Sequence, residues 1–287
     1  CYTMSQEKFV SHVSHVGNLP IADPVIADNV LDLFSLKGKV ASVTGSSMGI
    51  GQAVAEAYAQ AGADVAIWYN STPADSQAKE LSEKYGIKCK AYKCQIGDFK
   101  QVRQTIEQIE KDFGKIDIFV ANAGVAWDSG AISSDLSDEE SYKEWRRIWD
   151  LDVDAVYFCS KILGEIFKRQ GYGSYIITAS ISAHIANVPQ FQTPYNAAKA
   201  AVKHFAKSLA IEWAGFARVN TVSPGYINTE MVRKLPSHLK GKWYSLVPMG
   251  RLGLPKELVG AYLFLASDAS TYATGTDIII DGGYTSV

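Results

Sequence analysis

The segment from residue 39 to residue 51 reads Lys-Val-Ala-Ser-Val-Thr-Gly-Ser-Ser-Met-Gly-Ile-Gly, and this stretch decides the fold. Its first part, residues 39–44, is a short apolar run that predicts a β-strand. Glycines follow at positions 45, 49 and 51, and the alanine-rich segment 51–60 predicts a helix that ends before Gly62. The stretch therefore predicts a strand, a tight glycine turn and a helix in direct succession.

The same alternation of apolar runs and helical patterns continues to the C-terminus. It predicts strands at residues 39–44, 64–69, 88–94, 116–121, 174–178, 218–223 and 277–280. It predicts helices at residues 51–60, 73–85, 100–113, 140–170, 194–213 and 256–266. Such alternation is typical of βαβ units. We therefore predict an α/β fold: a doubly wound parallel sheet of about seven strands with helices on both faces. It forms a single domain at residues 36–287, after an N-terminal extension at residues 1–35.

Composition and charge argue against several classes of function. The 287 residues carry a formal net charge of −2 and no run of Lys and Arg, so we expect no nucleic-acid partner. No apolar run approaches the ~18 residues of a membrane span, and the N-terminus lacks the pattern of a secretory signal. Cys89 and Cys94 are five residues apart and lack zinc spacing, so we expect no metal. We interpret all four cysteines as free thiols of a reducing compartment, the cytoplasm.

The glycine turn has the residues of a dinucleotide-binding site. Gly45 allows a sharp turn, Gly49 allows close approach to a pyrophosphate, and Gly51 allows the helix to pack against the strand. The helix that follows offers free N–H groups and the positive end of its dipole to the phosphates. A lone glycine pattern is equally consistent with an ordinary loop, but its position between an apolar strand and a helix favours nucleotide binding.

The end of the second predicted strand indicates which nucleotide binds. An acidic residue there would bind the ribose 2′-hydroxyl of NAD. This chain has Asn70 and Ser71 instead, and no carboxylate before Asp75. Short polar side chains can hydrogen-bond a 2′-phosphate without repelling it, which predicts NADPH and NADP+ as the cofactor. Met48 occupies a turn position where an arginine would have supported this prediction.

Small residues follow the fourth predicted strand, at Asn122, Ala123 and Gly124. They would allow a flat adenosine group to lie against the end of the strand. Taken alone, however, this segment indicates only a turn.

Tyr195 and Lys199 carry the strongest signal of chemistry. Their i, i+4 spacing places both side chains on one face of a helix. A free phenol has a pKa near ~10, and a nearby ammonium group favours the phenolate and lowers that pKa. The pair is therefore a candidate proton donor to a carbonyl oxygen. In isolation, this spacing is more often that of a half-buried aromatic residue beside a solvated lysine.

Five motifs occur in an order that resembles the short-chain dehydrogenase/reductase family. They are Thr44-Gly45-x-x-x-Gly49-Ile50-Gly51, Asn122-Ala123-Gly124, Ser180, Tyr195-x-x-x-Lys199 and Ser223-Pro224-Gly225. The resemblance covers about residues 36–287. Within the family, residues 30–44, 63–71 and 208–227 are similar to the yeast NADPH-dependent carbonyl and sorbose reductases. The resemblance implies reversible, NADPH-dependent reduction of a ketone or ketose to a secondary, chiral alcohol.

The resemblance also implies a role for each matching residue. Tyr195 would protonate the carbonyl oxygen, Lys199 would lower the pKa of Tyr195 and hold the nicotinamide ribose, and Ser180 would orient the substrate oxygen. The remaining implied cofactor contacts are Gly45, Ser47, Met48 and Ile50 at the pyrophosphate and ribose, Asn70 and Ser71 at the 2′-phosphate, Gln95 and Ile96 at the adenine, and Pro224, Gly225, Ile227 and Thr229 at the nicotinamide.

Two positions depart from the pattern of the family. Where the family commonly has an asparagine that holds a proton-relay water, this chain has Asp152, whose carboxylate can accept from water or Lys199 but brings a charge. The serine can be Ser180 or Ser182, which precede Tyr195 by 15 and 13 residues. The usual gap is nearer the shorter value, but the sequence 179–183 favours Ser180, with the extra residues in the loop 187–194.

The substrate pocket is expected to be lined by residues 127–141, 184–191 and 226–244. Trp127, Phe191, Trp243 and Tyr244 could form apolar walls, although such aromatic residues are more often core residues. His184, Asn187 and Gln192 could contact sugar hydroxyls. The resemblance suggests ketoses such as sorbose or fructose, or prochiral aryl and keto-ester ketones.

Two other functions are compatible with a nucleotide-binding domain of this kind. One is an isomerase or dehydratase that retains its nucleotide; the short C-terminal region argues against it. The other is a non-catalytic NADP(H)-binding protein, which has no need of the Ser-Tyr-Lys set. The resemblance further implies a homo-tetramer that uses the helices at 140–170 and 194–213 and the C-terminal strand.

Overall fold

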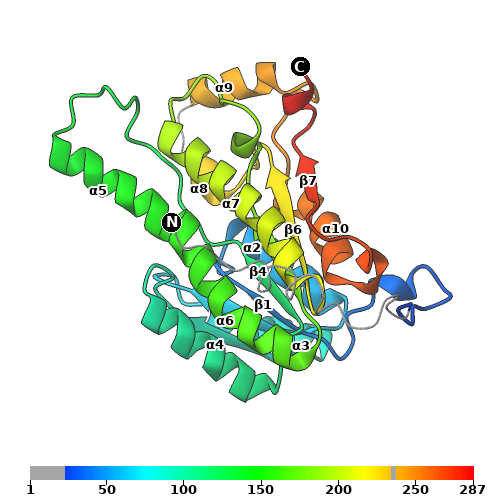
Figure 1. Ribbon diagram of the computed structural model, residues 1–287. Coiled ribbons are helices and arrows are strands. Elements are labelled where there is room, and N and C mark those ends of the chain that lie inside the picture. Colours follow the sequence, from blue (N-terminus) through cyan, green and yellow to red (C-terminus); the bar gives the residue numbers. More distant parts are fainter. Residues whose placement is uncertain (1–22, 234–236) are drawn as a thin grey trace, which may run out of the picture.

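Seven parallel strands form the sheet of the computed structural model, which describes residues 23–233 and 237–287 (Figure 1). The strand order is β3-β2-β1-β4-β5-β6-β7, and every neighbouring pair is parallel. The strands are β1 (Val40–Val43), β2 (Asp64–Tyr69), β3 (Cys89–Lys93), β4 (Ile118–Ala121), β5 (Ser174–Thr178), β6 (Arg218–Pro224) and β7 (Asp277–Ile280). The predicted α/β fold is therefore confirmed.

The α-helices of the described chain cover both faces of this sheet. They are α2 (Gly49–Gln60), α3 (Asp75–Tyr85), α4 (Phe99–Phe113), α5 (Asp138–Trp149), α6 (Ala155–Gln170), α7 (Thr193–Trp213), α8 (Glu230–Arg233), α9 (Ser237–Leu246) and α10 (Pro255–Ala266). The shorter helical turns are η1 (Asp32–Phe34), η2 (Asp150–Asp154), η3 (Ile181–Ala183), η4 (Asp268–Ser270) and η5 (Tyr284–Ser286). No helix in the part of the chain that the structure describes is long and apolar enough to cross a membrane.

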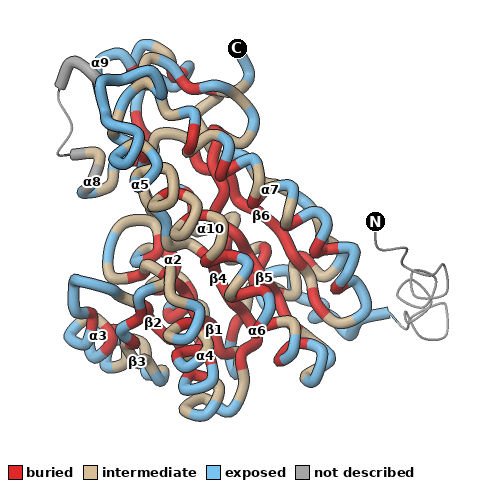
Figure 2. The backbone as a smooth tube through the Cα atoms, turned by 60° about the vertical axis from the view of Figure 1, so that its left-hand side comes forward, coloured by how far each residue is buried: buried red, intermediate tan, exposed pale blue. Residues whose placement is uncertain are grey.

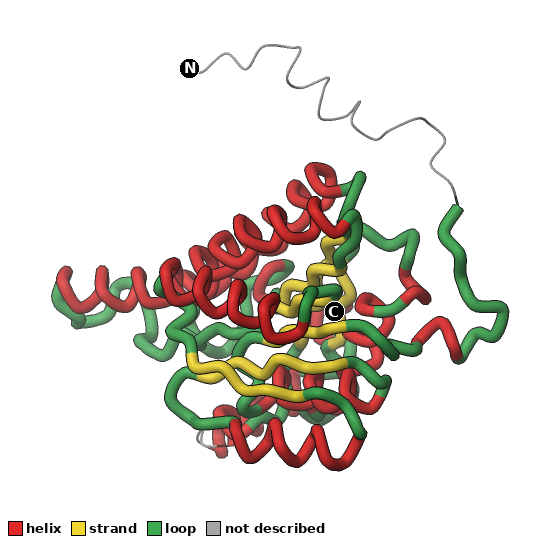
Figure 3. Tube along the Cα trace, turned by 90° about the horizontal axis from the view of Figure 1, so that it is seen from below, coloured by secondary structure: helices red, strands yellow, loops and turns green. Residues whose placement is uncertain are grey.

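Each strand contributes to two separate cores, because successive side chains point to opposite faces of a sheet. On β4, Ile118 and Val120 pack with α2, α3 and α10, whereas Phe119 packs with α4, α6 and α7. The five inner strands are buried along most of their length (Figure 2), the edge strands β3 and β7 only partly, and the sheet lies between the two helical layers (Figure 3). Burial on both faces explains why the strands appear in the sequence as continuous apolar runs.

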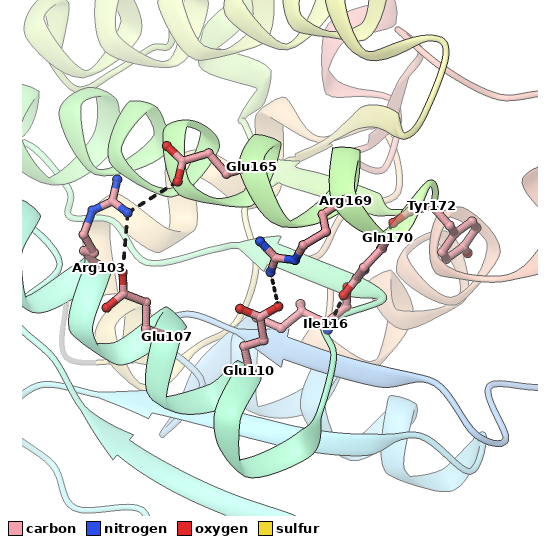
Figure 4. Close-up of polar contacts among 8 residues, drawn as sticks. All are labelled: Arg103, Glu107, Glu110, Ile116, Glu165, Arg169, Gln170 and Tyr172. Atoms are coloured by element: carbon pink, nitrogen blue, oxygen red, sulfur yellow. Dashed lines mark hydrogen bonds and ion pairs between the residues drawn. The ribbon is translucent and has the colours of Figure 1, made fainter. Parts of the chain in front are cut away.

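The outer surfaces of α4 and α6 are joined by polar contacts (Figure 4). Arg103 of α4 lies 3.5 Å from Glu107 of the same helix and 3.5 Å from Glu165 of α6, and Arg169 pairs with Glu110. At the end of α6, Gln170 accepts from the backbone N–H of Ile116 and donates to its carbonyl oxygen, at 3.1 and 2.7 Å. This amide fixes the end of α6 beside the start of β4.

The structure corrects two features of the predicted element order. The helix predicted at 140–170 is found, but it contains the π-helical turn η2 between α5 and α6, and its α5 end projects from the body (Figure 1). Helices α8 and α9 were not predicted, because these segments are short and lack a clear apolar period. The expected N-terminal extension lies mostly outside the described residues, and its boundary at residue 36 stays a prediction.

The order of the strands reverses between β1 and β4. The chain runs from β1 outward to β2 and β3, then crosses to β4 and continues to β7 on the other side. Loops after β1 and β4 therefore leave the sheet in opposite directions, and ligands of such sheets bind in the opening between them. Both the glycine turn and the segment Asn122–Gly124 lie at this edge, since they directly follow β1 and β4.

Candidate active site

The glycine turn after β1 has a backbone that few other residues could adopt. Gly45 and Gly49 have φ values of 61° and 62°, in the left-handed region. A Cβ on Gly51 would lie 2.4 Å from the carbonyl oxygen of Gly45, so the start of α2 touches the turn. Met48, at the N-cap of α2, makes no side-chain capping bond, which leaves first-turn N–H groups available to a phosphate.

The segment after β4 is hydrogen-bonded to this turn. Thr44 Oγ1 accepts from the backbone N–H groups of Asn122 and Ala123, both at 2.9 Å. Asn122 Nδ2 donates to the carbonyl oxygens of Thr44 and Gly45, at 3.0 and 3.3 Å. The Asn122 side chain thus supports the turn itself, which its sequence position alone did not indicate.

The residues predicted at the adenosine end follow β2 and β3 at the same edge of the sheet. Asn70 and Ser71 are exposed directly after β2, and the first carboxylate beyond them, Asp75, is the first residue of α3. Ser46 connects this end to the turn: its Oγ accepts from the backbone N–H of Trp68 at 3.0 Å. Gln95 and Ile96 follow β3 in the corresponding position. These residues fit a nucleotide that carries a 2′-phosphate.

The residues predicted at the nicotinamide end follow β6. The backbone N–H of Gly225 donates to the carbonyl oxygen of Ile280 at 2.9 Å, and a Cβ on Gly225 would lie 2.6 Å from Asp281 Cα. Beyond Pro224, Ile227 forms an isolated parallel bridge with Gly253. Thr229 then reaches the glycine turn, because a Cβ on Gly49 would lie 3.6 Å from its Cγ2. The residues predicted at the nicotinamide therefore reach those predicted at the pyrophosphate.

Tyr195, Lys199, Ser180 and Asp152 form one cluster beside this site. Lys199 Nζ lies 5.5 Å from the centre of the Tyr195 ring, as the i, i+4 spacing on α7 predicts. Ser180, directly before η3, lies close enough to Tyr195 to lower the pKa of its phenol. Lys199 Nζ also donates to the carbonyl oxygen of Thr178 at 3.2 Å and lies 2.8 Å from Asp152 Oδ1. Residues far apart in the sequence thus meet around one phenol group.

The net shift in the pKa of Tyr195 is the reverse of the one expected. Burial raises the pKa of this phenol; Lys199 opposes that effect and Asp152 adds to it. Burial lowers the pKa of Lys199, but the interactions with Asp152 and Tyr195 together outweigh it, so that the net pKa is also raised. Lys199 lowers the pKa of Tyr195, as predicted. Burial of the phenol and the carboxylate of Asp152 raise that pKa by more, so the net shift is upward.

The two candidate serines have different partners. Ser180 Oγ accepts from the backbone N–H of Ser182 at 3.1 Å, and Ser180 lies close enough to Tyr195 to lower its pKa. Ser182 Oγ donates to Asn187 Oδ1 at 2.7 Å and accepts from Gln192 Nε2 at 3.0 Å. Ser180 is therefore the serine that the fold brings to the phenol, whereas Ser182 holds the loop before α7.

Of the residues expected to line the substrate pocket, some are buried and others are exposed. Trp127 is buried and donates to the carbonyl oxygen of Gly130 at 2.7 Å, whereas Phe191 and Tyr244 are largely exposed. Trp243 is buried and stacks on Tyr226 with ring centres 4.5 Å apart. His184 does not turn to the phenol: its ring nitrogens lie 2.7 Å from Asp277 Oδ2 and 3.2 Å from Lys203 Nζ.

One residue that the sequence reasoning missed is Gln190. Its side chain donates to the Tyr226 hydroxyl at 3.0 Å and accepts from Trp243 Nε1 at 3.0 Å. It thereby ties the loop before α7 to α9. The signal in the sequence was a run of three amides at Asn187, Gln190 and Gln192 within a single loop.

Within residues 23–233 and 237–287, no group of three or more His, Cys, Asp or Glu side chains is arranged to hold a metal ion. The cysteines of this part, Cys89, Cys94 and Cys159, are free thiols.

The chain matches known proteins over nearly its whole length. A family model described as enoyl-(acyl carrier protein) reductase matches residues 45–285. The chain is 60% identical over 266 residues to a probable NADP-dependent mannitol dehydrogenase of Yarrowia lipolytica, covering 93% of this chain and 94% of that protein. It is 59% identical over 283 residues to the sorbose reductase of Candida albicans, covering 98% and 99%.

A solved structure has the same fold. The NADPH-dependent 3-quinuclidinone reductase from Rhodotorula rubra aligns with a TM-score of 0.89 and 43% sequence identity, over 94% of this chain and 100% of that one. The matched residues include the glycine turn, the Ser180–Tyr195–Lys199 cluster and the segment after β6. Sequence, fold and site therefore agree, and the chain belongs to the short-chain dehydrogenase/reductase family.

Proposed function

We propose that this protein uses NADPH to reduce the carbonyl group of a ketone or ketose to a secondary alcohol, reversibly. The observation that carries the proposal is the clustering of Ser180, Tyr195 and Lys199, with Lys199 one helical turn further along α7 than Tyr195. This group lies at the edge of the sheet that bears the glycine turn. When bound, NADPH supplies the hydride that the carbonyl carbon accepts.

The residues of the cluster then act on the carbonyl oxygen. Tyr195 donates its proton to that oxygen, so that carbon gains the hydride, oxygen gains the proton, and the products are the alcohol and NADP+. Ser180 donates a hydrogen bond to the same oxygen and orients it, which stabilises the negative charge that develops there. Lys199 holds the nicotinamide ribose hydroxyls. In the reverse direction, Tyr195 accepts the proton of the alcohol.

The cofactor preference follows from the residues after β2. Asn70 and Ser71 are exposed there and carry no charge, so a 2′-phosphate meets hydrogen-bonding groups and no carboxylate. The relative from Yarrowia lipolytica is named as NADP-dependent, in agreement with this reading.

We propose a ketose, such as sorbose or fructose, as the preferred substrate. The named substrates of the relatives are polyols and ketoses. Asn187, Gln190 and Gln192 make the loop before α7 rich in amide groups, and the half-buried Gln190 and Gln192 suit a substrate with several hydroxyl groups. Aryl and keto-ester ketones lack these groups and gain less from such a surface.

The test is ketone-dependent loss of nicotinamide absorbance, with NADPH or NADH as the reductant and sorbose, fructose or an aryl ketone as the substrate. We expect NADPH to be consumed with the ketoses. In Tyr195→Phe, kcat should fall by about 10²-fold or more while NADPH still binds. The matched control is Tyr272→Phe, because Tyr272 is fully exposed and its loss should leave turnover unchanged.

Other outcomes of this assay would identify the other functions. Conversion of a substrate without net NADPH consumption would indicate an isomerase or dehydratase. Tight NADPH binding with no turnover of any substrate would indicate a non-catalytic binding protein. Wild-type kcat in Tyr195→Phe would contradict the role proposed for this residue.

We also propose that the chain assembles as a homo-tetramer in the cytoplasm. Exposed apolar side chains on α6 and α7, Tyr157 and Ile211, support a subunit contact on these helices. The free thiols Cys89, Cys94 and Cys159 support a reducing compartment. Light scattering of the purified protein measures the oligomeric state, and the mass of a monomer would contradict the tetramer. Imaging of the tagged protein in cells tests the cytoplasmic location.

A further inference from the structure

A buried carboxylate faces the lysine of the Tyr195 cluster. Asp152 Oδ1 lies 2.8 Å from Lys199 Nζ, and the two side chains are 0% and 6% exposed. The second carboxylate oxygen, Oδ2, accepts from the backbone N–H of Val125 at 3.0 Å. Asp152 is therefore held on both sides, and it shares the only positive charge described in this cluster.

The backbone is shaped to bring this carboxylate in. Asp152 lies in the π-helical turn η2, between α5 and α6, and such turns inside helices are frequent at functional sites. Gly124 leaves the space for it, because a Cβ at that position would lie 2.6 Å from Asp152 Oδ1 and 3.4 Å from Lys199 Nζ. An ordinary side chain at residue 124 would displace the ion pair.

The charges around the phenol decide which form of Tyr195 is stable. From α7 the cluster contains Tyr195 and Lys199, from η2 it contains Asp152, and from the end of β5 it contains the neutral Ser180. The carboxylate and the ammonium group already cancel. Ionisation of Tyr195 would therefore leave a net negative charge in a buried site, which is costly. Without Asp152, phenolate and ammonium would cancel instead.

We propose that Asp152 keeps Tyr195 in its protonated, proton-donating form and thereby biases the site toward carbonyl reduction. This inference rests on the proposed function of Tyr195. Asp152 is a positioning residue in this scheme, because it neutralises Lys199 and repels the phenolate without touching the substrate. The raised pKa values of Tyr195 and Lys199 have the directions that such an arrangement requires.

The direct test is titration of the Tyr195 phenol by its ultraviolet phenolate absorbance. The signal of Tyr195 is isolated by subtracting the spectrum of the matching Tyr195→Phe protein, in both the wild-type and the Asp152→Asn backgrounds. We expect the midpoint of ionisation to fall by about one pH unit or more in Asp152→Asn, because Lys199 then acts on the phenol without opposition. In turnover assays, the alkaline rise of alcohol oxidation should shift down in pH by a similar amount.

The chain offers a matched control two residues away. Asp154 lies in the same turn but pairs with Arg146 at the surface, where both side chains are 39% exposed. Asp154→Asn removes an equal charge and should leave the Tyr195 midpoint unchanged. A fall of the same size in Asp154→Asn would contradict the proposal, since the effect would then be a general one of charge.

A second pair of variants keeps the test informative if Asp152→Asn leaves Lys199 too poorly compensated to fold. Lys199→Met is compared with the double variant Asp152→Asn/Lys199→Met, which has no buried charge at either position. The midpoint should be lower in the double variant, because only the carboxylate distinguishes the two proteins. Equal midpoints in this pair, or in wild type and a folded Asp152→Asn, would overturn the inference.

The two proposals fail separately. If the wild-type protein does not reduce any ketone but the phenol midpoint falls in Asp152→Asn, the proposed function is wrong and the charge effect of Asp152 is supported. If ketones are reduced and the midpoint does not move, the proposed function is supported and the inference about Asp152 is wrong.

Discussion

The most demanding prediction concerns a single methyl group at the glycine turn, in Gly51→Ala. Gly51 lies in the first turn of α2, and an added Cβ would lie 2.4 Å from the carbonyl oxygen of Gly45 and 2.5 Å from Asn122 Nδ2. Ordinary contact begins near 3.4 Å, so the helix and the turn must separate by about 1 Å. That movement strains the two hydrogen bonds from Asn122 to Thr44 and Gly45.

The expected cost follows from these contacts. Overpacking by one methyl group costs about 1–3 kcal/mol, and two weakened hydrogen bonds add about 0.5–1.5 kcal/mol each. The free energy of unfolding should therefore fall by about 2–6 kcal/mol, which corresponds to a decrease in Tm of roughly 5–20 °C. Because the turn also forms the predicted pyrophosphate site, NADPH affinity should fall by about tenfold or more, equivalent to 1.4 kcal/mol.

The assay combines thermal unfolding with NADPH titration by fluorescence, and the control is Gly260→Ala. Gly260 also lies within a helix, α10, but an added Cβ there meets no atom within 4 Å. That variant should gain about 0.5–1 kcal/mol, because alanine favours a helix over glycine. If Gly51→Ala melts at the wild-type temperature and binds NADPH equally well, the packing argument for the turn is refuted.

Three further predictions concern the cofactor, the thiols and the polar contacts of α4 and α6. In Asn70→Asp, a carboxylate would face the 2′-phosphate, so the KM for NADPH should rise by about tenfold or more while the KM for NADH does not, as steady-state kinetics would measure. Burial raises the pKa of Cys89 to about 12 and also raises those of Cys94 and Cys159. Alkylation near pH 8, followed by peptide mapping, should therefore be at least about tenfold slower at these thiols than in free cysteine; rapid labelling would contradict this. Chemical denaturation should show a loss of less than about 1 kcal/mol in Arg103→Ala, whose ion pairs are partly solvated, but about 1–3 kcal/mol in Gln170→Ala, which leaves the backbone of Ile116 without its partners. Equal losses in the two variants would show that the distinction is wrong.

The sheet could be predicted from the sequence because its five inner strands are buried along nearly their whole length, whereas the edge strands β3 and β7 are only partly buried. The runs at 64–69, 174–178 and 277–280 coincide with β2, β5 and β7 as found, and most other strand boundaries differ by one or two residues. A continuous apolar run is a local signal that does not depend on the rest of the chain. The π-helical turn η2 gives no such signal, because one extra residue in a turn barely alters the helical period. Helix α9 contains Gly241 and mixes polar with apolar residues, so its pattern is weak.

The candidate site shows the same division between local and long-range information. The spacing of Tyr195 and Lys199 is local, and it placed the two side chains together on α7. The choice between Ser180 and Ser182 rested on the pattern of residues 179–183 at the end of the strand, which favoured Ser180, the serine that lies close enough to the phenol to affect its pKa. The net direction of the Tyr195 pKa could not be obtained from spacing, because it depends on burial and on Asp152, which lies 43 residues before Tyr195 in the sequence.

The position of Asp152 connects the fold to the direction of the chemistry. A lysine beside a phenol is expected to promote the phenolate, and a phenolate is a proton acceptor suited to alcohol oxidation. Here a π-helical turn delivers a carboxylate to that lysine, and Gly124 leaves room for it, so the buried charges balance before the phenol ionises. The π-helical turn and Gly124 are both features of the backbone, and neither supplies a reacting group. A site that retains the residues of a reversible reaction can therefore be biased toward proton donation by a neighbouring turn of helix.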